Sequence, residues 1–153
     1  MKTTELLQLL ANEWPSPTCA FIPEFRGGTG YSREQRADAI AMHLWPSTGL
    51  ELVGFELKVS RSDWLHELKN PYKATSIKQF CDRWYLVVPN LKIVKYADEL
   101  PSDWGLKFVE NGEIKTMIEA TKLEPKPIDR IFFASLMRRA TKPVDYLKEG
   151  IKV

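Results

Sequence analysis

The chain has 153 residues, of which 44% are hydrophobic and 27% charged, and this composition predicts a single soluble domain covering residues 1–153. Lys and Arg (22) nearly balance Asp and Glu (20), so the chain lacks the overall basic charge that by itself indicates nucleic-acid binding. The basic excess is local. Residues 115–153 carry nine basic and five acidic side chains, which predicts a basic surface, although a solvated face gives the same counts.

Targeting signals and disulfides are not expected. The N-terminal segment "MKTTELLQLLANEW" predicts an amphipathic helix and not a signal peptide, and no apolar run is long enough to span a membrane. Cys19 and Cys81 cannot make a disulfide framework and have no metal-ligand spacing. We therefore expect an intracellular, cytoplasmic protein with reduced thiols and no membrane partner.

The first half of the chain predicts a helix followed by three strands. Thr3 or Thr4 is the expected cap of the helix, and "TCAFIPEF" predicts a short strand. The stretch "RGGTGYSREQ" has three glycines among polar residues, which predicts a loop, and without the Gly-Lys-Ser/Thr ending of a P-loop it is not expected to bind a nucleotide. The segments "ADAIAMHLW" and "LELVGFELKVS", joined by "PSTG", predict an antiparallel hairpin.

The second half predicts a helix, a strand, a second hairpin and a last helix. Ser60 or Ser62 is the expected cap of the helix, and "RWYLVVP" predicts the strand. Asn111-Gly112 is a two-residue hairpin turn within "GLKFVENGEIKTMIEA", and Asp129 caps the helix "RIFFASLMRRA". This alternation of helices and strands predicts an α/β fold.

Two charges in the middle of an apolar strand need an explanation. Glu56 and Lys58 lie two positions apart and therefore share one face of the strand, opposite Phe55 and Leu57. Burying an ionised group is costly unless it is paired or bound to a metal. Asp38 is likewise the one acidic residue of the preceding apolar segment.

Asp38, Glu56 and Lys58 together suggest metal chemistry. Two neighbouring carboxylates repel each other unless a cation lies between them, and an oxygen-lined site suits Mg²⁺ or Mn²⁺. A nearby lysine can orient a water for attack on phosphorus, so the pattern predicts metal-assisted hydrolysis of a phosphodiester. A structural ion-pair cluster is the competing interpretation.

The register of the first hairpin tests this hypothesis. A plain four-residue turn over "PSTG" would pair position 38 with position 57 and would turn Asp38 away from Glu56. The site needs an offset of one residue, supplied either by an odd loop or by a bulge, for which Gly54 is the favoured position.

These residues resemble the PD-(D/E)XK nuclease superfamily, in which Asp and Glu-x-Lys lie across a hairpin. More closely, "PEF", "RADAIAM", "GFELKVSRSDW", "YKA", "CDRWYLVVP" and "WGLKFVENGEIKTMIEA" are similar in order to MmcB-like DNA repair proteins. The resemblance implies a restriction-endonuclease-like αβββαβ core with a mixed central sheet flanked by helices, plus a C-terminal β-hairpin and helix. It spans roughly residues 20–140.

The resemblance also implies a set of site residues. Asp38 and Glu56 would bind Mg²⁺ or Mn²⁺, the Leu57 carbonyl would add an oxygen, and Lys58 would position water. For a further acidic ligand the superfamily nominates Glu5 or Glu13 of the first helix, whereas the closer resemblance favours Glu24. Ala37 stands where the superfamily name has proline, a departure that removes no ligand.

DNA is the implied partner, and RNA is not excluded. Arg36, Arg61 and Lys73 are candidates for contacts to backbone phosphates, with Arg61 at a helix start where the dipole also favours anions. Members that cut both strands often dimerise, so a homodimer is compatible with the resemblance. The alternative is a non-catalytic nucleic-acid-binding or scaffold protein on the same fold.

Overall fold

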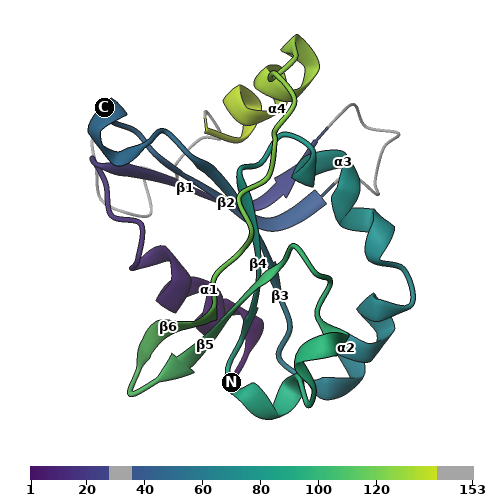
Figure 1. The fold of residues 1–153 in the computed structure, drawn as a ribbon. Helices are drawn as coiled ribbons and strands as arrows, with labels where there is room; N and C mark the ends of the chain where they lie inside the picture. Colours follow the sequence, from purple (N-terminus) through teal and green to yellow (C-terminus); the bar gives the residue numbers. More distant parts are fainter. Residues whose placement is uncertain (28–35, 141–153) are drawn as a thin grey trace.

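A computed structural model describes residues 1–27 and 36–140 and contains one six-stranded sheet (Figure 1). The glycine-rich segment 28–35 and residues 141–153, which fall within the predicted single domain, lie outside the described residues. The strands follow one another across the sheet in chain order. They are β1 (Cys19–Arg26), β2 (Arg36–His43), β3 (Leu52–Leu57), β4 (Arg83–Val88), β5 (Gly105–Glu110) and β6 (Glu113–Ile118).

The sheet is mixed, as expected. β1, β2 and β3 are antiparallel neighbours, β3, β4 and β5 run parallel, and β6 returns antiparallel to β5. The parallel pairs require crossover connections, and the chain between β3 and β4 supplies helices for the first of them. The predicted α/β class is thus confirmed, and the second hairpin extends the central sheet.

Helices cover both faces of the sheet. They are α1 (Thr3–Ala11), α2 (Arg61–Leu68), α3 (Thr75–Lys78) and α4 (Arg130–Ala140). Leu6 and Leu10 of α1 pack with Phe55 and Leu57 in a core on one face. The other face packs against α2, α3 and α4, which contribute Trp64, Ile77 and Phe132 to a second core. No helix of the described residues is long and apolar enough to cross a bilayer.

Most of the predicted caps and turns are present. Ser60 accepts the Asp63 amide at 3.2 Å and Asp129 accepts the Phe132 amide at 2.8 Å, so both cap their helices. Asn111 and Gly112 have φ of 52° and 76°, as a two-residue hairpin turn requires.

The first helix begins differently from the prediction. Its N-cap is Lys2, whose backbone amide donates to the Glu5 carboxylate at 2.8 Å, so neither Thr3 nor Thr4 is the cap. A negative side chain near a helix N-terminus is favourable for the helix dipole.

The segment 119–129 carries the chain from β6 across the sheet to α4 (Figure 1). The amides of Leu123 and Lys126 donate to the carbonyls of Asp82 and Gln79 at 2.7 and 2.8 Å. At the far end of this segment, Phe132 of α4 packs edge-on against Phe25 of β1, with ring centroids 5.5 Å apart. The last helix is therefore fixed beside the first strand.

Candidate active site

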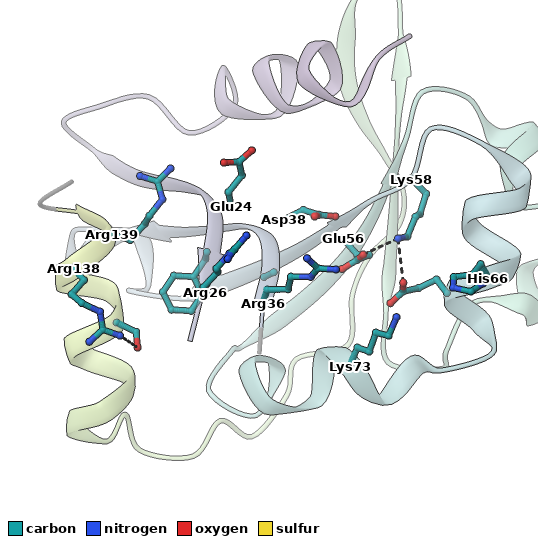
Figure 2. A pocket seen from close by; sticks show the side chains of 14 residues that line it. Glu24, Arg26, Arg36, Asp38, Glu56, Lys58, His66, Lys73, Arg138 and Arg139 are labelled. Carbon is teal, nitrogen blue, oxygen red and sulfur yellow. Dashed lines mark hydrogen bonds and ion pairs between the residues drawn. The ribbon is translucent and has the colours of Figure 1, made fainter. Parts of the chain in front are cut away.

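The β2–β3 hairpin places Asp38 opposite Glu56. Its ladder pairs Ala39 with Phe55, and one further step in the same register brings position 38 opposite position 56. Directly opposite residues of an antiparallel pair share a face. Both carboxylates line one pocket of about 1130 Å³ (Figure 2). The shared face that the hypothesis required is present.

A loop with an odd number of residues produces this register. The His43 amide donates to the Glu51 carbonyl at 3.4 Å, so the loop consists of residues 44–50 and is longer than the four-residue turn over "PSTG". Gly49 and Leu50 turn the chain back with positive φ of 96° and 55°. The offset of one residue therefore arises at the tip of the hairpin.

Gly54 is not a bulge, and that prediction is wrong. Gly54 pairs with Ile40 within the regular ladder. A Cβ at this position would collide with the Trp84 indole ring on the neighbouring strand. The glycine is needed because a large aromatic side chain packs directly over the backbone of β3.

The two carboxyl groups lie in a partly dry environment. Asp38 Oδ2 accepts the Leu57 amide at 2.8 Å, which fixes the carboxylate at the end of β3. Burial raises the pKa of Asp38 despite this hydrogen bond. Burial, and then the charge of Asp38, raise the pKa of Glu56 to about 8. Near neutral pH the pair favours holding a proton or another cation.

Lys58 lies between two carboxylates. Its Nζ is 3.0 Å from Glu56 Oε1 and 3.1 Å from Glu67 Oε2. Burial alone would lower the pKa of Lys58, but the two carboxylates outweigh burial and raise it. The ammonium group is therefore charged and held at the pocket wall.

Glu67 is a site residue that the sequence analysis missed. It lies on α2, its side chain lines the pocket, and only 7% of the residue is exposed. A signal was present, because Trp64, Glu67 and Leu68 follow the spacing of an apolar helix face. An acidic residue on such a face needs a partner, and Lys58 provides it.

Of the three candidates for a further acidic ligand, only Glu24 lines the pocket. It falls opposite Asp38 in the β1–β2 register and has a positive φ of 51°, which interrupts the regular pairing. Glu5 lies in α1 and Glu13 just after it, in a part of the chain whose apolar side chains pack on the other face of the sheet. The structure thus separates these two residues from Asp38 and Glu56.

Two of the three predicted phosphate contacts lie at the pocket. Arg36 and Lys73 line it (Figure 2), but Arg61 does not. Arg61 instead donates to both carboxylate oxygens of Glu99, at 2.7 and 2.6 Å, and to the Ile93 carbonyl at 2.8 Å. The structure therefore gives Arg61 a structural role in holding the start of α2.

Arginines that the sequence analysis did not select also line the pocket. Arg138 and Arg139 come from α4 and Arg26 from the end of β1 (Figure 2). Arg139 Nε donates to the Pro23 carbonyl at 3.0 Å, which ties α4 to β1 beside Glu24. The pocket therefore has carboxylates beside Lys58 and basic side chains around them.

The carboxylates fit a magnesium-type site in part. Among residues 1–27 and 36–140, no three or more His, Cys, Asp or Glu side chains are grouped to hold a metal ion. Mg²⁺ is commonly bound by one or two carboxylates and keeps several waters. Asp38 and Glu56 supply such a pair, and the raised pKa of each shows that negative charge is unfavourable there without a cation.

Comparisons with known proteins identify a similar fold. Neither a scan against protein-family models nor a search of curated proteins gives a match. Among solved structures, the chain is similar to a protein of unknown function from Silicibacter pomeroyi, with a TM-score of 0.56 and 19% identity over 95% of this chain and 88% of that one. At this identity the likeness concerns the fold alone, so function has to be argued from the pocket.

Proposed function

We propose that this protein is a metal-dependent nuclease with a restriction-endonuclease-like fold that hydrolyses phosphodiester bonds in DNA. The observation that carries the proposal is the juxtaposition of Asp38 and Glu56 across the β2–β3 hairpin, with Lys58 beside them in an open pocket. The αβββαβ order of the elements agrees with this assignment. DNA repair, recombination or the processing of phage and mobile-element DNA is the setting that the resemblance suggests.

The residues around the acidic pair have separate roles in this proposal. Asp38 and Glu56 would hold Mg²⁺ or Mn²⁺, and the Leu57 carbonyl and Glu24 are candidates for additional oxygens. When bound, such an ion polarises the phosphate and makes a water more acidic. Lys58 orients the attacking water, whose oxygen bonds to phosphorus as the bond to the leaving oxygen breaks. The water gives up a proton to solvent, and the leaving oxygen takes one up from solvent.

The charge distribution of the pocket supports an anionic substrate. The basic side chains of the lining outnumber the acidic ones, and the raised pKa of Glu56 reduces its negative charge further. The basic side chains are Arg26, Arg36, Lys58, Lys73, Arg138 and Arg139, and the acidic ones are Glu24, Asp38, Glu56 and Glu67.

A cleavage assay tests the catalytic proposal. Wild-type protein should cut end-labelled duplex or single-stranded DNA in Mg²⁺ or Mn²⁺ and should leave it intact in EDTA. Asp38→Ala and Lys58→Ala should abolish cleavage and keep the near-ultraviolet circular dichroism of the folded protein. Full activity in either variant rejects the mechanism, and parallel assays on RNA show whether the sugar matters.

The rival function is a non-catalytic DNA-binding or scaffold protein on the same fold. Such a protein would shift the mobility of labelled DNA and leave it intact at every Mg²⁺ concentration. Sedimentation of the same samples with and without DNA would test the homodimer.

The arginines of α4 give a second test, which concerns DNA binding. Replacing Arg138 and Arg139 by alanine should lower the slope of log affinity against log salt by about one to two units, measured without metal by fluorescence anisotropy. A matched control, Lys126→Ala with Arg130→Ala, removes the same charge from exposed residues outside the pocket lining. An equal loss in both variants would mean that the pocket is not the contact surface.

A further inference from the structure

Lys58 is the link between the two carboxylates of the proposed cation site and a third carboxylate on α2. Its Nζ lies 3.0 Å from Glu56 and 3.1 Å from Glu67, so the ammonium group is shared almost equally between them. Glu67 is the more buried partner, with 8% of its side chain exposed against 13% for Glu56. The arrangement combines a strand and a helix around one cation.

Binding of a divalent ion would affect the two ion pairs of Lys58 differently. Glu56 oxygens that bind the ion are less available to Lys58, and the ion repels the ammonium group because both are positive. Glu67 comes from α2 and is not one of the two carboxylates assigned to the ion. It is therefore the carboxylate that can keep Lys58 in place while Glu56 changes partner.

The helix that carries Glu67 is itself fixed. Its N-cap is Ser60, and Arg61 pairs with Glu99 outside the pocket at 2.6 Å. Trp64, one turn before Glu67, is fully buried among core aromatic residues and lies 6.1 Å from Trp104 between ring centroids. A rigid helix gives Glu67 a defined position that a surface loop would not.

We propose that Glu67 is a positioning residue that anchors the Lys58 ammonium group beside the cation site when Glu56 is engaged by a divalent ion. This inference rests on the proposed nuclease function for its consequence, but the anchoring itself is a property of the folded protein. Glu67 contacts Lys58 and does not act on the substrate. Loss of Glu67 should therefore release Lys58 only when the ion is present.

Nuclear magnetic resonance of ¹⁵N-lysine-labelled protein tests the anchoring directly. An ammonium group held in an ion pair exchanges its protons slowly with water and gives a signal, which Lys58→Met identifies by its disappearance. The Lys58 signal should persist in wild-type protein on addition of Mg²⁺. In Glu67→Gln it should be lost on addition of Mg²⁺, and Glu67→Asp, which keeps the charge, should retain part of it.

Cleavage rates give the second arm. Glu67→Gln should slow cleavage by about 10- to 100-fold, as is typical when a residue that orients a metal-site group is replaced, and Glu67→Asp, which keeps the charge, should recover part of the rate. Glu51→Gln, which breaks the 2.9 Å Arg83 ion pair, is the matched control and should change neither rate nor signal.

Each outcome decides the proposal. Persistence of the Lys58 signal in Glu67→Gln with Mg²⁺, its loss in wild-type protein with Mg²⁺, or a wild-type cleavage rate in Glu67→Gln would overturn it. If wild-type protein does not cleave DNA, the resonance arm still decides the anchoring, so the two failures are distinguishable. If Glu67→Gln does not fold, Glu67→Asp decides: a signal retained in part or in full with Mg²⁺ supports anchoring by the charge, and its complete loss overturns it.

Discussion

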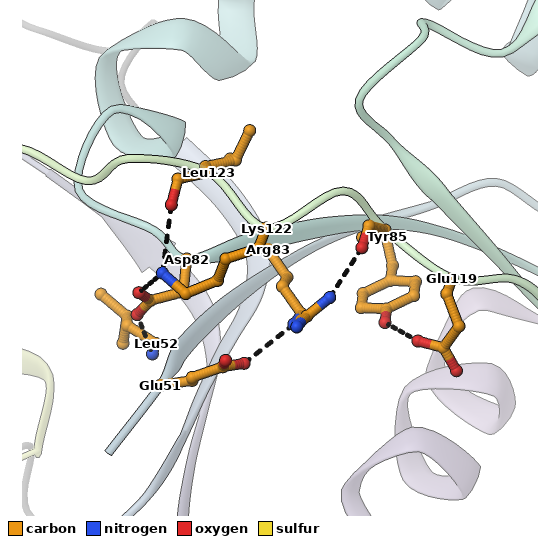
Figure 3. A network of polar contacts seen from close by, with 9 residues as sticks. Glu51, Leu52, Asp82, Arg83, Tyr85, Glu119, Lys122 and Leu123 are labelled. Carbon is orange, nitrogen blue, oxygen red and sulfur yellow. Dashed lines mark hydrogen bonds and ion pairs between the residues drawn. The ribbon is translucent and has the colours of Figure 1, made fainter. Parts of the chain in front are cut away.

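Strand β3 is held at both ends by an aspartate, and the two ends differ in charge balance. At its start, Asp82 Oδ2 accepts the Leu52 amide at 2.8 Å, and at its end Asp38 Oδ2 accepts the Leu57 amide at the same distance. Asp82 also receives Lys122 at 2.6 Å (Figure 3). Asp38 instead faces Glu56, a second carboxylate.

At the start of β3, each acidic side chain is paired with a basic one. Glu51 binds Arg83 at 2.9 Å, and Arg83 also donates to the Ala120 carbonyl at 2.7 Å (Figure 3). These contacts fasten the segment that leads to α4. At the other end, Glu56 and Glu67 share the ammonium group of Lys58, and Glu56 also faces the carboxylate of Asp38. The two ends thus share backbone support but differ in charge neutralisation, which makes the second cluster the candidate functional site.

The largest expected difference between the two ends is in cleavage. Asp38→Asn keeps an oxygen acceptor for the Leu57 amide but removes a charged oxygen from the proposed cation site, so DNA cleavage should fall by more than about 100-fold. Asp82→Asn makes the same change at the other end and should leave the rate per folded molecule unchanged. A gel assay with both variants measures this, and equal rates would show that both aspartates are structural.

The second difference is in the pH dependence of stability. Folding raises the pKa of Glu56 from 4.5 to about 8, so the folded protein holds a proton that the unfolded chain releases in this range. The stabilising contribution of Glu56 is therefore fully present below pH 4.5 and is lost as pH rises through 8. Over this range the free energy of unfolding should fall by a few kcal/mol at most.

Urea denaturation at pH 5, 7 and 9 checks this dependence. The fall in the free energy of unfolding with rising pH should be smaller in Glu56→Gln. It should persist in Glu51→Gln, which removes an ion pair at the start of the same strand. Mg²⁺ at pH 9 should stabilise wild-type protein and not Glu56→Gln. Parallel curves for wild-type protein and Glu56→Gln would contradict a raised pKa at position 56.

The smallest expected difference is in stability at fixed pH. Asp82→Asn retains the acceptor for the Leu52 amide but loses the charge that binds Lys122, so the free energy of unfolding should fall by about 1 kcal/mol. Asp38→Asn should leave stability at pH 8 unchanged or slightly higher, because it removes a repulsive buried charge. Thermal unfolding of both variants distinguishes the two ends.

Much of the fold was predictable because its signals are local. Asn111-Gly112 turns a hairpin, Ser60 and Asp129 cap their helices, and the α/β order follows from the alternation of apolar segments. The candidate pair Asp38 and Glu56 was found because charges within apolar strands stand out against their neighbours.

The features that could not be predicted from the sequence depend on contacts between distant parts of the chain. Glu67 becomes a site residue only because α2 packs beside the end of β3, and Arg138 and Arg139 only because the segment 119–129 crosses the sheet. Arg61 was assigned to phosphate because its partner Glu99 comes from a remote loop. Gly54 was taken for a bulge because the sequence does not show that Trp84 lies against it.

The odd number of residues in the loop 44–50 has an evolutionary consequence. Side chains alternate along β3, so inserting or deleting one loop residue would either exchange the faces of Glu56 and Phe55 or force a compensating bulge. Changes of two residues would keep both cores and the pocket intact. Related sequences that retain Asp38 and Glu56 should therefore differ in the length of this loop by an even number of residues. The loop should keep an odd number of residues wherever the site is kept.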